Sequence, residues 1–304
     1  MSTFEQIYGT KTSIAVKDML ERCKNPKKKV LVLGRAGIGK STFCRYVAYR
    51  WAKQEIWLQY DLVVVIPLRS LTKDHYPRGT TYAPIDLIKN EYFSYPLLSN
   101  KDEELLKELI QRSKVLWLLD GYDEIAENLP SHLQGFMEHL LDTTHHILTS
   151  RPYAIALQYD VTMEITGFTD DNIVKYIQQF FDQIKDELVG ATFQGEKLLN
   201  FLKSNSRIWG TAHVPINLEL SCSLWGDIDW SETKSLTITM LYDKITSPPS
   251  GHTDSRDSQS TTSKGLRSYC FDILQNFLIL STTTYELDEY MPSNIPFSGQ
   301  DDVL

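Results

Sequence analysis

The stretch that decides the fold is Gly34-Arg35-Ala36-Gly37-Ile38-Gly39-Lys40-Ser41, which follows an apolar run at 29–33 and opens an amphipathic segment. Glycines between a strand and a helix let several backbone N–H groups converge on a phosphate, and the helix N-terminus adds positive potential. Lys40 would then reach the β- and γ-phosphates, and Ser41 would offer its hydroxyl to Mg2+. The stretch predicts a phosphate-binding P-loop, with the nucleotide-binding set extending to Thr42. The alternative is an ordinary strand-to-helix turn that contains glycines.

A second motif places acidic residues after a buried strand. The apolar run at 115–119 ends in Asp120-Gly121-Tyr122-Asp123-Glu124, as is typical of a parallel-sheet strand whose carboxyl end carries function. Asp120 is predicted beside the P-loop, where it would hold Mg2+ with Ser41. Asp123 or Glu124 would orient the attacking water. For these last two acids, a solvated turn is the alternative.

A third motif, Ile147-Leu148-Thr149-Ser150-Arg151-Pro152, is again a short strand that ends in polar residues. If this strand neighbours the other two, Arg151 lies where a γ-phosphate would be. Its planar guanidinium suits a phosphate and would bind the triphosphate better than the diphosphate. Arg151 is therefore a candidate γ-phosphate sensor. The alternative is an arginine that caps the sheet edge or pairs with a nearby acid.

Taken in this order, the three motifs resemble the NACHT domain of the STAND class of P-loop ATPases, over about residues 8–246. The D-G-x-D-E form of the second motif is the most specific part. The resemblance implies an ADP-bound closed form, an ATP-bound open form that self-associates, and a role in intracellular, innate-immune-like signalling. Ala212-His213-Val214-Pro215-Ile216-Asn217-Leu218 is similar to the family's helical-domain motif, which implies that Pro215 contacts adenine. Ile7-Tyr8-Gly9-Thr10-Lys11 loosely matches the segment that crosses the base, and an ordinary turn is the alternative.

Strands separated by helical segments predict an α/β fold, a three-layer P-loop NTPase with a parallel sheet, followed by a small helical domain and a partly disordered C-terminal tail. Strands are expected at 29–33, 62–66, 115–119, 147–150 and 161–165. Helices are expected at 12–24, 40–53, 85–92, 101–112 and 133–141. Beyond Thr169-Asp170-Asp171, a typical helix start, the pattern is helical only, with helices at 196–204 and 215–225.

The predicted division of the chain has six parts. They are an N-terminal helix and linker at 1–26, the nucleotide-binding domain at 27–168, a helical lid at 169–232, the start of an incomplete winged helix at 233–246, a disordered linker at 247–265, and a C-terminal helix and tail at 266–304. The linker is rich in Ser, Thr, Pro and Asp. No sensor repeat is visible. A minimal family member, a shortened isoform and a fragment all remain open.

Composition favours a cytoplasmic protein without a transmembrane segment. A net charge of −8 argues against broad nucleic-acid binding. The cysteines, Cys23, Cys44, Cys222 and Cys270, lack metal-ligand spacing and are expected to be reduced. His145-His146 is not expected to bind a metal, because adjacent strand residues face opposite ways.

The function favoured by these motifs is an ATP/ADP-binding, Mg2+-dependent switch with slow hydrolysis and signalling protein partners. Two alternatives remain. A P-loop kinase or phosphotransferase would share the first motif but needs an arginine-rich lid and an acceptor pocket. A non-catalytic protein-binding module would keep the fold around a degenerate nucleotide site.

Overall fold

The computed structural model describes residues 14–93, 100–154, 159, 161–185, 190–204 and 206–225 of the 304. The segment at 7–11 and the predicted winged-helix start, linker and C-terminal helix lie outside the described residues. The sheet, its covering helices and the candidate site all belong to the described part of the chain.

The centre of the fold is a five-stranded sheet in the order β2-β3-β4-β1-β5, and every pairing is parallel. The strands are β1 (Lys29–Leu33), β2 (Leu62–Pro67), β3 (Val115–Asp120), β4 (His145–Ser150) and β5 (Val161–Glu164). Because all five strands run the same way, the residues that follow β1, β3 and β4 meet at the end of the sheet where the strands have their carboxyl termini. The predicted parallel α/β sheet is confirmed, and β4 neighbours both β1 and β3.

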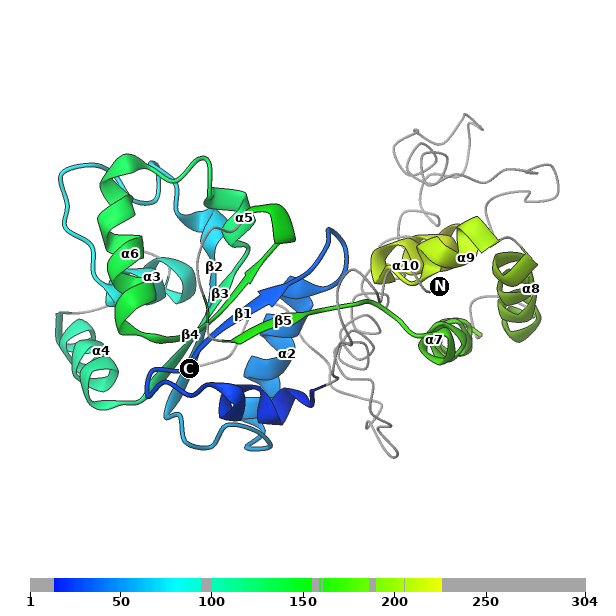
Figure 1. Ribbon diagram of the computed structural model, residues 1–304, viewed down its shortest axis with the longest axis horizontal. Helices are drawn as coiled ribbons and strands as arrows, with labels where there is room; N and C mark the ends of the chain where they lie inside the picture. Colours follow the sequence, from blue (N-terminus) through cyan, green and yellow to red (C-terminus); the bar gives the residue numbers. More distant parts are fainter. Residues whose placement is uncertain are drawn as a thin grey trace.

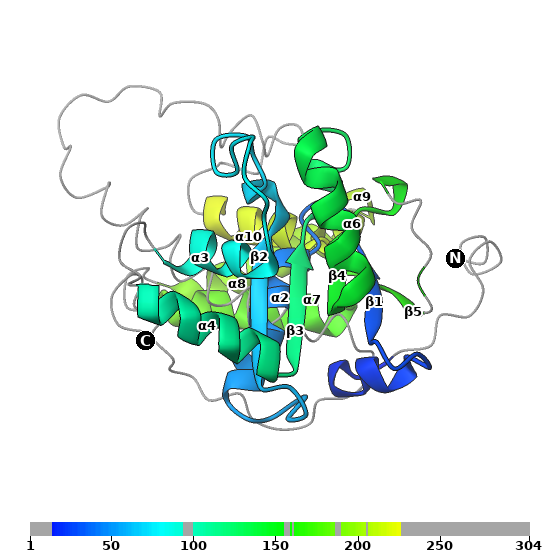
Figure 2. The same ribbon diagram turned by 90° about the vertical axis from the view of Figure 1, so that its left-hand side faces the viewer.

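Helices cover both faces of the sheet, which makes three layers (Figures 1 and 2). Side chains alternate along a strand, so Leu116 and Leu118 of β3 pack toward α2, whereas Trp117 and Leu119 pack toward α3 and α6. The helices of this part are η1 (Val16–Arg22), α2 (Lys40–Ala52), η2 (Leu68–Ser70), α3 (Pro84–Tyr92), α4 (Asn100–Arg112), α5 (Tyr122–Ile125), η3 (Ser131–Leu133), α6 (Gln134–Thr143) and η4 (Pro152–Ala154).

One expected helix differs in form. The segment expected as a helix at 12–24 is a 3-10 helix over Val16–Arg22. Val16 and Met19 are three residues apart and both are buried, a spacing that a three-residue turn aligns on one side. The apolar positions are therefore as expected, while the tighter turn shortens the element.

The described helices after the sheet form a second core, joined to β5 by an extended segment (Figure 1). They are α7 (Asp170–Gln183), α8 (Ala191–Ser204), α9 (Ser206–Ala212) and α10 (Pro215–Leu224). Thr169 caps α7, since its side chain accepts a hydrogen bond from the Asn172 N–H at 3.2 Å. Ile173, Tyr176 and Phe180 lie on one face of α7 and are fully buried against the other helices.

A tyrosine covers part of the open edge of the sheet. β2 is an edge strand, and the Tyr92 hydroxyl at the end of α3 donates to the Val65 carbonyl at 2.7 Å and accepts from the Val65 N–H at 3.0 Å. Both outward backbone groups of Val65 are thereby satisfied. Since Pro67 has no N–H, it offers no donor on this strand either.

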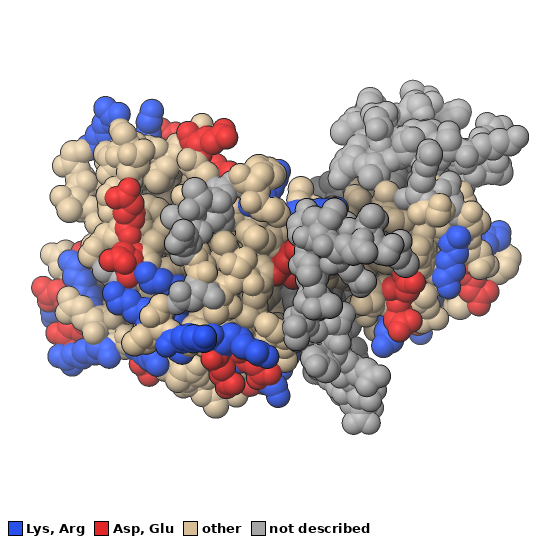
Figure 3. Space-filling model, in the orientation of Figure 1, with Lys and Arg blue, Asp and Glu red and all other residues tan. Residues whose placement is uncertain are grey.

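One ion pair links α4 to α3 on the outside of the sheet. Glu103 of α4 lies 3.0 Å from Lys89 of α3 and 2.8 Å from Lys107 in its own helix. In Figure 3 the positive and negative side chains of this lobe are interspersed on the visible face. Ion pairs that keep some contact with solvent contribute little stability each, so α4 is held mainly by Leu106 and Ile110, which pack against the core.

Candidate functional site

The glycine-rich loop lies between β1 and α2, as predicted. Gly37 and Gly39 have φ of 70° and 106°, in the left-handed region that favours glycine. Gly39 is the residue before α2, and its carbonyl accepts the Phe43 N–H at 2.8 Å. The Gly34 N–H donates to the Ser150 carbonyl at 3.0 Å, which fixes the start of the loop to β4. The loop backbone therefore curls at the N-terminus of a long helix, where an anion is stabilised.

Lys40 reaches back over this loop. Its Nζ donates to the carbonyl oxygens of Gly34 at 3.0 Å and Arg35 at 3.2 Å. Burial lowers the pKa of the Lys40 ammonium, an effect that the nearby carboxylates of Asp123 and Asp120 oppose. A cation held among loop carbonyls and acids is placed to meet phosphate oxygens. Ser41 is exposed and Thr42 half-buried in the first turn of α2.

Asp120 ends β3, one strand removed from β1, because β4 lies between them. Its Oδ1 accepts the Thr149 hydroxyl at 2.6 Å and lies 3.9 Å from Cys44 Sγ in α2. Thr149 in turn accepts the Gly121 N–H at 2.9 Å. The carboxylate at the end of β3 thus contacts residues of both β4 and α2.

The structure separates the two remaining acids. Asp123 has only 5% of its side chain exposed, and its Oδ2 lies 2.8 Å from Arg151 Nε. This contact is an ion pair without good hydrogen-bond alignment, whereas Asp123 Oδ1 accepts the Arg151 backbone N–H at 3.1 Å. Asp123 is therefore not in a solvated turn. Glu124 is exposed.

Arg151 follows β4, at the predicted edge, and its guanidinium has two partners. Besides the ion pair with Asp123, its Nη1 donates to the Tyr153 hydroxyl at 2.8 Å. About two fifths of the side chain, 39%, is exposed. Arg151 is thus paired with a nearby acid, as the alternative from the sequence has it. The pairing leaves part of the side chain open to solvent.

The helical part touches the P-loop. A Cβ added to Gly37 would lie 2.4 Å from Ile216 Cγ2, so the side chain of Ile216 fills the space beside the glycine. Pro215 is buried as the first residue of α10. The backbone N–H of Phe168 donates to the His213 carbonyl at 2.8 Å, and His213 Nδ1 lies 2.6 Å from the Phe168 carbonyl. The loop before α10 is thereby fixed to the segment that leaves the sheet.

Sequence reasoning missed Thr149, Cys44, Tyr153 and Ile216 as parts of this site. Thr149 had a signal in the sequence, because it directly follows the apolar pair Ile147-Leu148 within an expected strand. Tyr153 contacts Arg151 two residues away, whereas Cys44 and Ile216 meet Asp120 and Gly37 only through contacts between distant elements, which no local pattern shows.

Metal ligation elsewhere has no support in the described ranges, where no three His, Cys, Asp or Glu side chains gather. His145 contacts Tyr60 and His146 contacts Tyr159, so the two histidines point apart, as predicted. Burial lowers the pKa of His146 to about 4. Cys23, Cys44 and Cys222 are buried and form no disulfide. Among the described helices, none is long and apolar enough to cross a membrane.

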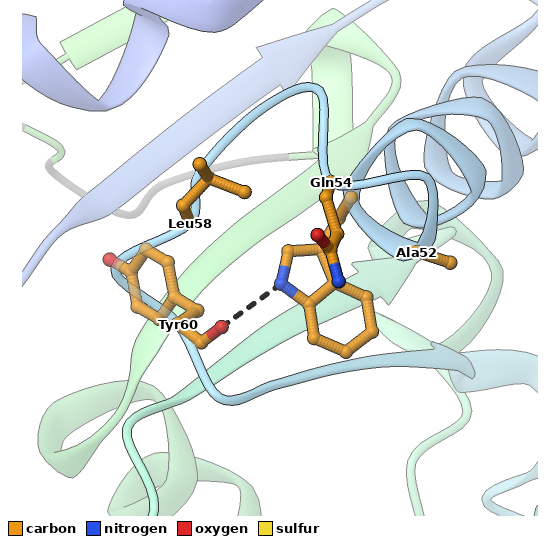
Figure 4. Close-up of a pocket in the computed structure, with 5 residues that line it drawn as sticks. Ala52, Gln54, Leu58 and Tyr60 are labelled. Carbon is orange, nitrogen blue, oxygen red and sulfur yellow. Dashed lines mark hydrogen bonds between the residues drawn. The ribbon is translucent and has the colours of Figure 1, made fainter.

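A hollow of about 410 Å3 lies at the other end of α2 (Figure 4). It is lined by Trp51, Ala52, Gln54, Leu58 and Tyr60, and the Trp51 indole N–H donates to the Tyr60 carbonyl at 3.0 Å. The 13 residues of α2 separate it from the P-loop by about 20 Å. Its lining carries no charged side chain, so the hollow is not the phosphate site.

The sheet order, the glycine loop after β1 and the acid that ends β3 define a P-loop NTPase. The chain belongs to the NACHT domain family, which matches residues 28–183. Family and fold together identify a nucleotide-binding module of the kind that signalling proteins carry.

The curated relatives are large proteins. The human MHC class II transactivator is 27% identical over 64% of this chain and 18% of its own length. NLR family CARD domain-containing protein 4 of Xenopus tropicalis is 24% identical over 76% and 22%. Baculoviral IAP repeat-containing protein 1e of Mus musculus is 26% identical over 82% and 18%. The chain thus spans about a fifth of each relative.

A solved structure described as "Structure of Drosophila ORC bound to DNA" is also similar. It aligns at 12% identity over 87% of this chain and 64% of that chain. The TM-score is 0.37, too low to support an argument about function.

Proposed function

We propose that this chain is a Mg2+-dependent ATP/ADP switch that hydrolyses ATP slowly, with a closed ADP form and an ATP form that opens and self-associates. The observation that supports this most is the contact of Ile216 with Gly37. It joins the helical part directly to the loop that would hold the phosphates. A ligand that contacts both parts can shift their arrangement, because it stabilises one arrangement more than the other. The proposal places the module in the cytoplasm, where thiols stay reduced.

The residues fit a nucleotide in their chemistry. The left-handed backbone at Gly37 and Gly39 is of the kind that turns successive N–H groups toward an anion, and Lys40 supplies positive charge. Ser41 and Asp120 would hold Mg2+, which neutralises charge on the phosphates when bound. Pro215 would lie near adenine. We therefore include in the proposal every residue that the sequence predicts to bind the nucleotide, which are residues 34–42 and Pro215.

The acids divide their roles in this proposal. Glu124 is exposed and free to orient water, whereas the contacts of Asp123 assign it to Arg151. Arg151 would contact the γ-phosphate with the part of its guanidinium that is exposed. The sequence offers Asp123 or Glu124 to orient the attacking water, and this geometry favours Glu124.

The test of the proposed function is the nucleotide that the protein carries. The chain is purified without added nucleotide, denatured, and the released small molecules are identified by chromatography. We expect ADP in near-equimolar amount. A protein that releases no nucleotide and takes up neither ATP nor ADP would contradict the proposal and favour a non-catalytic module. Phosphoryl transfer to a small acceptor would instead identify a phosphotransferase.

The division between the acids gives a kinetic prediction. Glu124→Gln is expected to slow single-turnover ATP hydrolysis by about 100-fold or more, because a group that orients water contributes on this scale. Its ATP affinity should stay within about 3-fold, since uniform binding is unchanged. Asp123→Asn, by contrast, is expected to change the ratio of ATP to ADP affinity by about 5-fold, because it loosens Arg151.

Glu127→Gln is the matched control for this pair, since Glu127 is an exposed acid three residues after Glu124. It should leave both hydrolysis and affinity unchanged. If Asp123→Asn abolished hydrolysis while Glu124→Gln did not, the assignment of the two acids would be reversed. Rapid-quench measurement of the first turnover separates hydrolysis from product release.

A further inference from the structure

The carboxylate of Asp120 has two oxygens with different surroundings. Oδ1 accepts a short hydrogen bond of 2.6 Å from the Thr149 hydroxyl and lies near the Cys44 thiol. Within the described part of the chain, Oδ2 has no hydrogen-bond partner. One oxygen is therefore held by the protein, and the other remains available to a ligand.

The proton of the Thr149 hydroxyl has one assignment. A carboxylate only accepts hydrogen bonds, so Thr149 must donate its hydrogen to Asp120. A lone pair of the same hydroxyl accepts the Gly121 N–H at 2.9 Å. Thr149 thus bridges the side chain of Asp120 and the backbone directly after it, and at 0% exposure no water competes for these bonds.

We propose that Thr149 is a positioning residue for the metal-binding carboxylate of this site. By fixing Oδ1 it sets the rotation of the Asp120 side chain and leaves Oδ2 to the metal ion. Groups that orient a metal ligand typically contribute about 10- to 100-fold to metal affinity. This inference rests on the proposed function, in which Asp120 holds Mg2+ together with Ser41.

The position of Thr149 on β4 extends its effect. Arg151, the proposed γ-phosphate sensor, is two residues further along the same chain segment, and its backbone N–H is held by Asp123. Leu148, next to Thr149, is in register with Leu119, next to Asp120. The end of β4 is therefore joined to the end of β3 and the turn after it by three hydrogen bonds that involve a side chain: Thr149 to Asp120, Gly121 to Thr149, and the Arg151 N–H to Asp123. The metal-binding acid and the sensor arginine thus lie on segments that hydrogen bonds connect.

The test is the Mg2+ requirement for nucleotide binding. The full chain is titrated with MgCl2 at a fixed concentration of a fluorescent ADP analogue, and binding is repeated in EDTA. Thr149→Val keeps the shape but removes the hydroxyl, and we expect it to need about 10- to 100-fold more Mg2+ for half-maximal binding. Thr149→Ser keeps the hydroxyl and should stay within about 3-fold of the parent. In EDTA all three proteins should bind alike.

A double-mutant cycle distinguishes positioning from a general loss of structure. In an Asp120→Ala background, Thr149→Val should have no further effect on the Mg2+ requirement, because its target is absent. A parent-like Mg2+ requirement in Thr149→Val, or a full effect in the Asp120→Ala background, would overturn the inference. If Thr149→Val does not fold, Thr149→Cys replaces it, and the weak thiol donor should give an intermediate requirement. A parent protein that binds no nucleotide contradicts the proposed function instead.

Discussion

Replacing Lys40 with alanine is expected to lower the affinity for ATP by about 100-fold or more, because it removes charge-assisted hydrogen bonds that contribute about 1.5–3 kcal/mol each. The ammonium already lies over the loop, within 3.2 Å of the carbonyls of Gly34 and Arg35. Because Lys40 is partly buried, its attraction to a phosphate is weakly screened by water, and water does not replace that attraction when the charge is removed. Isothermal titration calorimetry with ATP and with ADP measures the loss.

Lys53→Ala is the matched control, since Lys53 lies at the other end of α2 and is exposed. It should bind ATP as the parent does. The Lys40 variant should also keep its far-ultraviolet circular dichroism, because the residue packs in no core cluster. Retained micromolar affinity in a folded Lys40→Ala protein would argue that the loop does not hold the phosphates.

The second large effect is expected on stability, from Gly167→Ala. A Cβ there would lie 2.3 Å from the His213 carbonyl oxygen and 2.9 Å from Ile38 Cδ1, and φ is +98°. The oxygen belongs to the backbone that also accepts the Phe168 N–H, so it cannot move away without breaking that bond. Strain and overpacking together are expected to cost about 3 kcal/mol or more.

Gly79→Ala separates strain from crowding. Gly79 has a similar φ of +95°, but nothing lies within 4 Å of the added Cβ. It should therefore cost only the left-handed backbone term of about 1–2 kcal/mol. In thermal unfolding, where 1 kcal/mol corresponds to roughly 2–4 °C at this size, Gly167→Ala should melt well below Gly79→Ala. Equal melting temperatures would mean that the junction at Gly167 yields without cost.

Local patterns in the sequence were sufficient for the sheet and for the position of the loop. β1, β2 and β3 are short apolar runs between turn signals, and the run at 115–119 marks β3 because both of its faces are buried. Thr169 marked the start of α7 because a capping side chain acts within three residues. α5 and α9 were missed, since they have four and seven residues and too few turns to show a period.

The contacts within the candidate site could not be predicted in the same way. Arg151 meets Asp123 only because β4 lies next to β3, and the strand order is a property of the whole sheet. Asp123 and Glu124 are adjacent acids with no local difference in the sequence, yet one is buried and the other exposed. Ile216 reaches Gly37 across nearly 180 residues of chain. Tertiary packing decides these contacts.

The hydroxyl of Tyr92 on Val65 has a consequence for how copies of the chain could assemble. An uncovered outer strand is a template on which a strand of another molecule can add, which leads to fibres as readily as to defined complexes. Here the phenol occupies both backbone groups at Val65 and Pro67 supplies no donor, so strand addition is opposed at these two positions of β2. Nucleotide-dependent assembly would then proceed through side-chain surfaces, which can be released when the nucleotide changes. Tyr92→Phe, which frees the Val65 groups, would be the variant in which irreversible aggregation first appears.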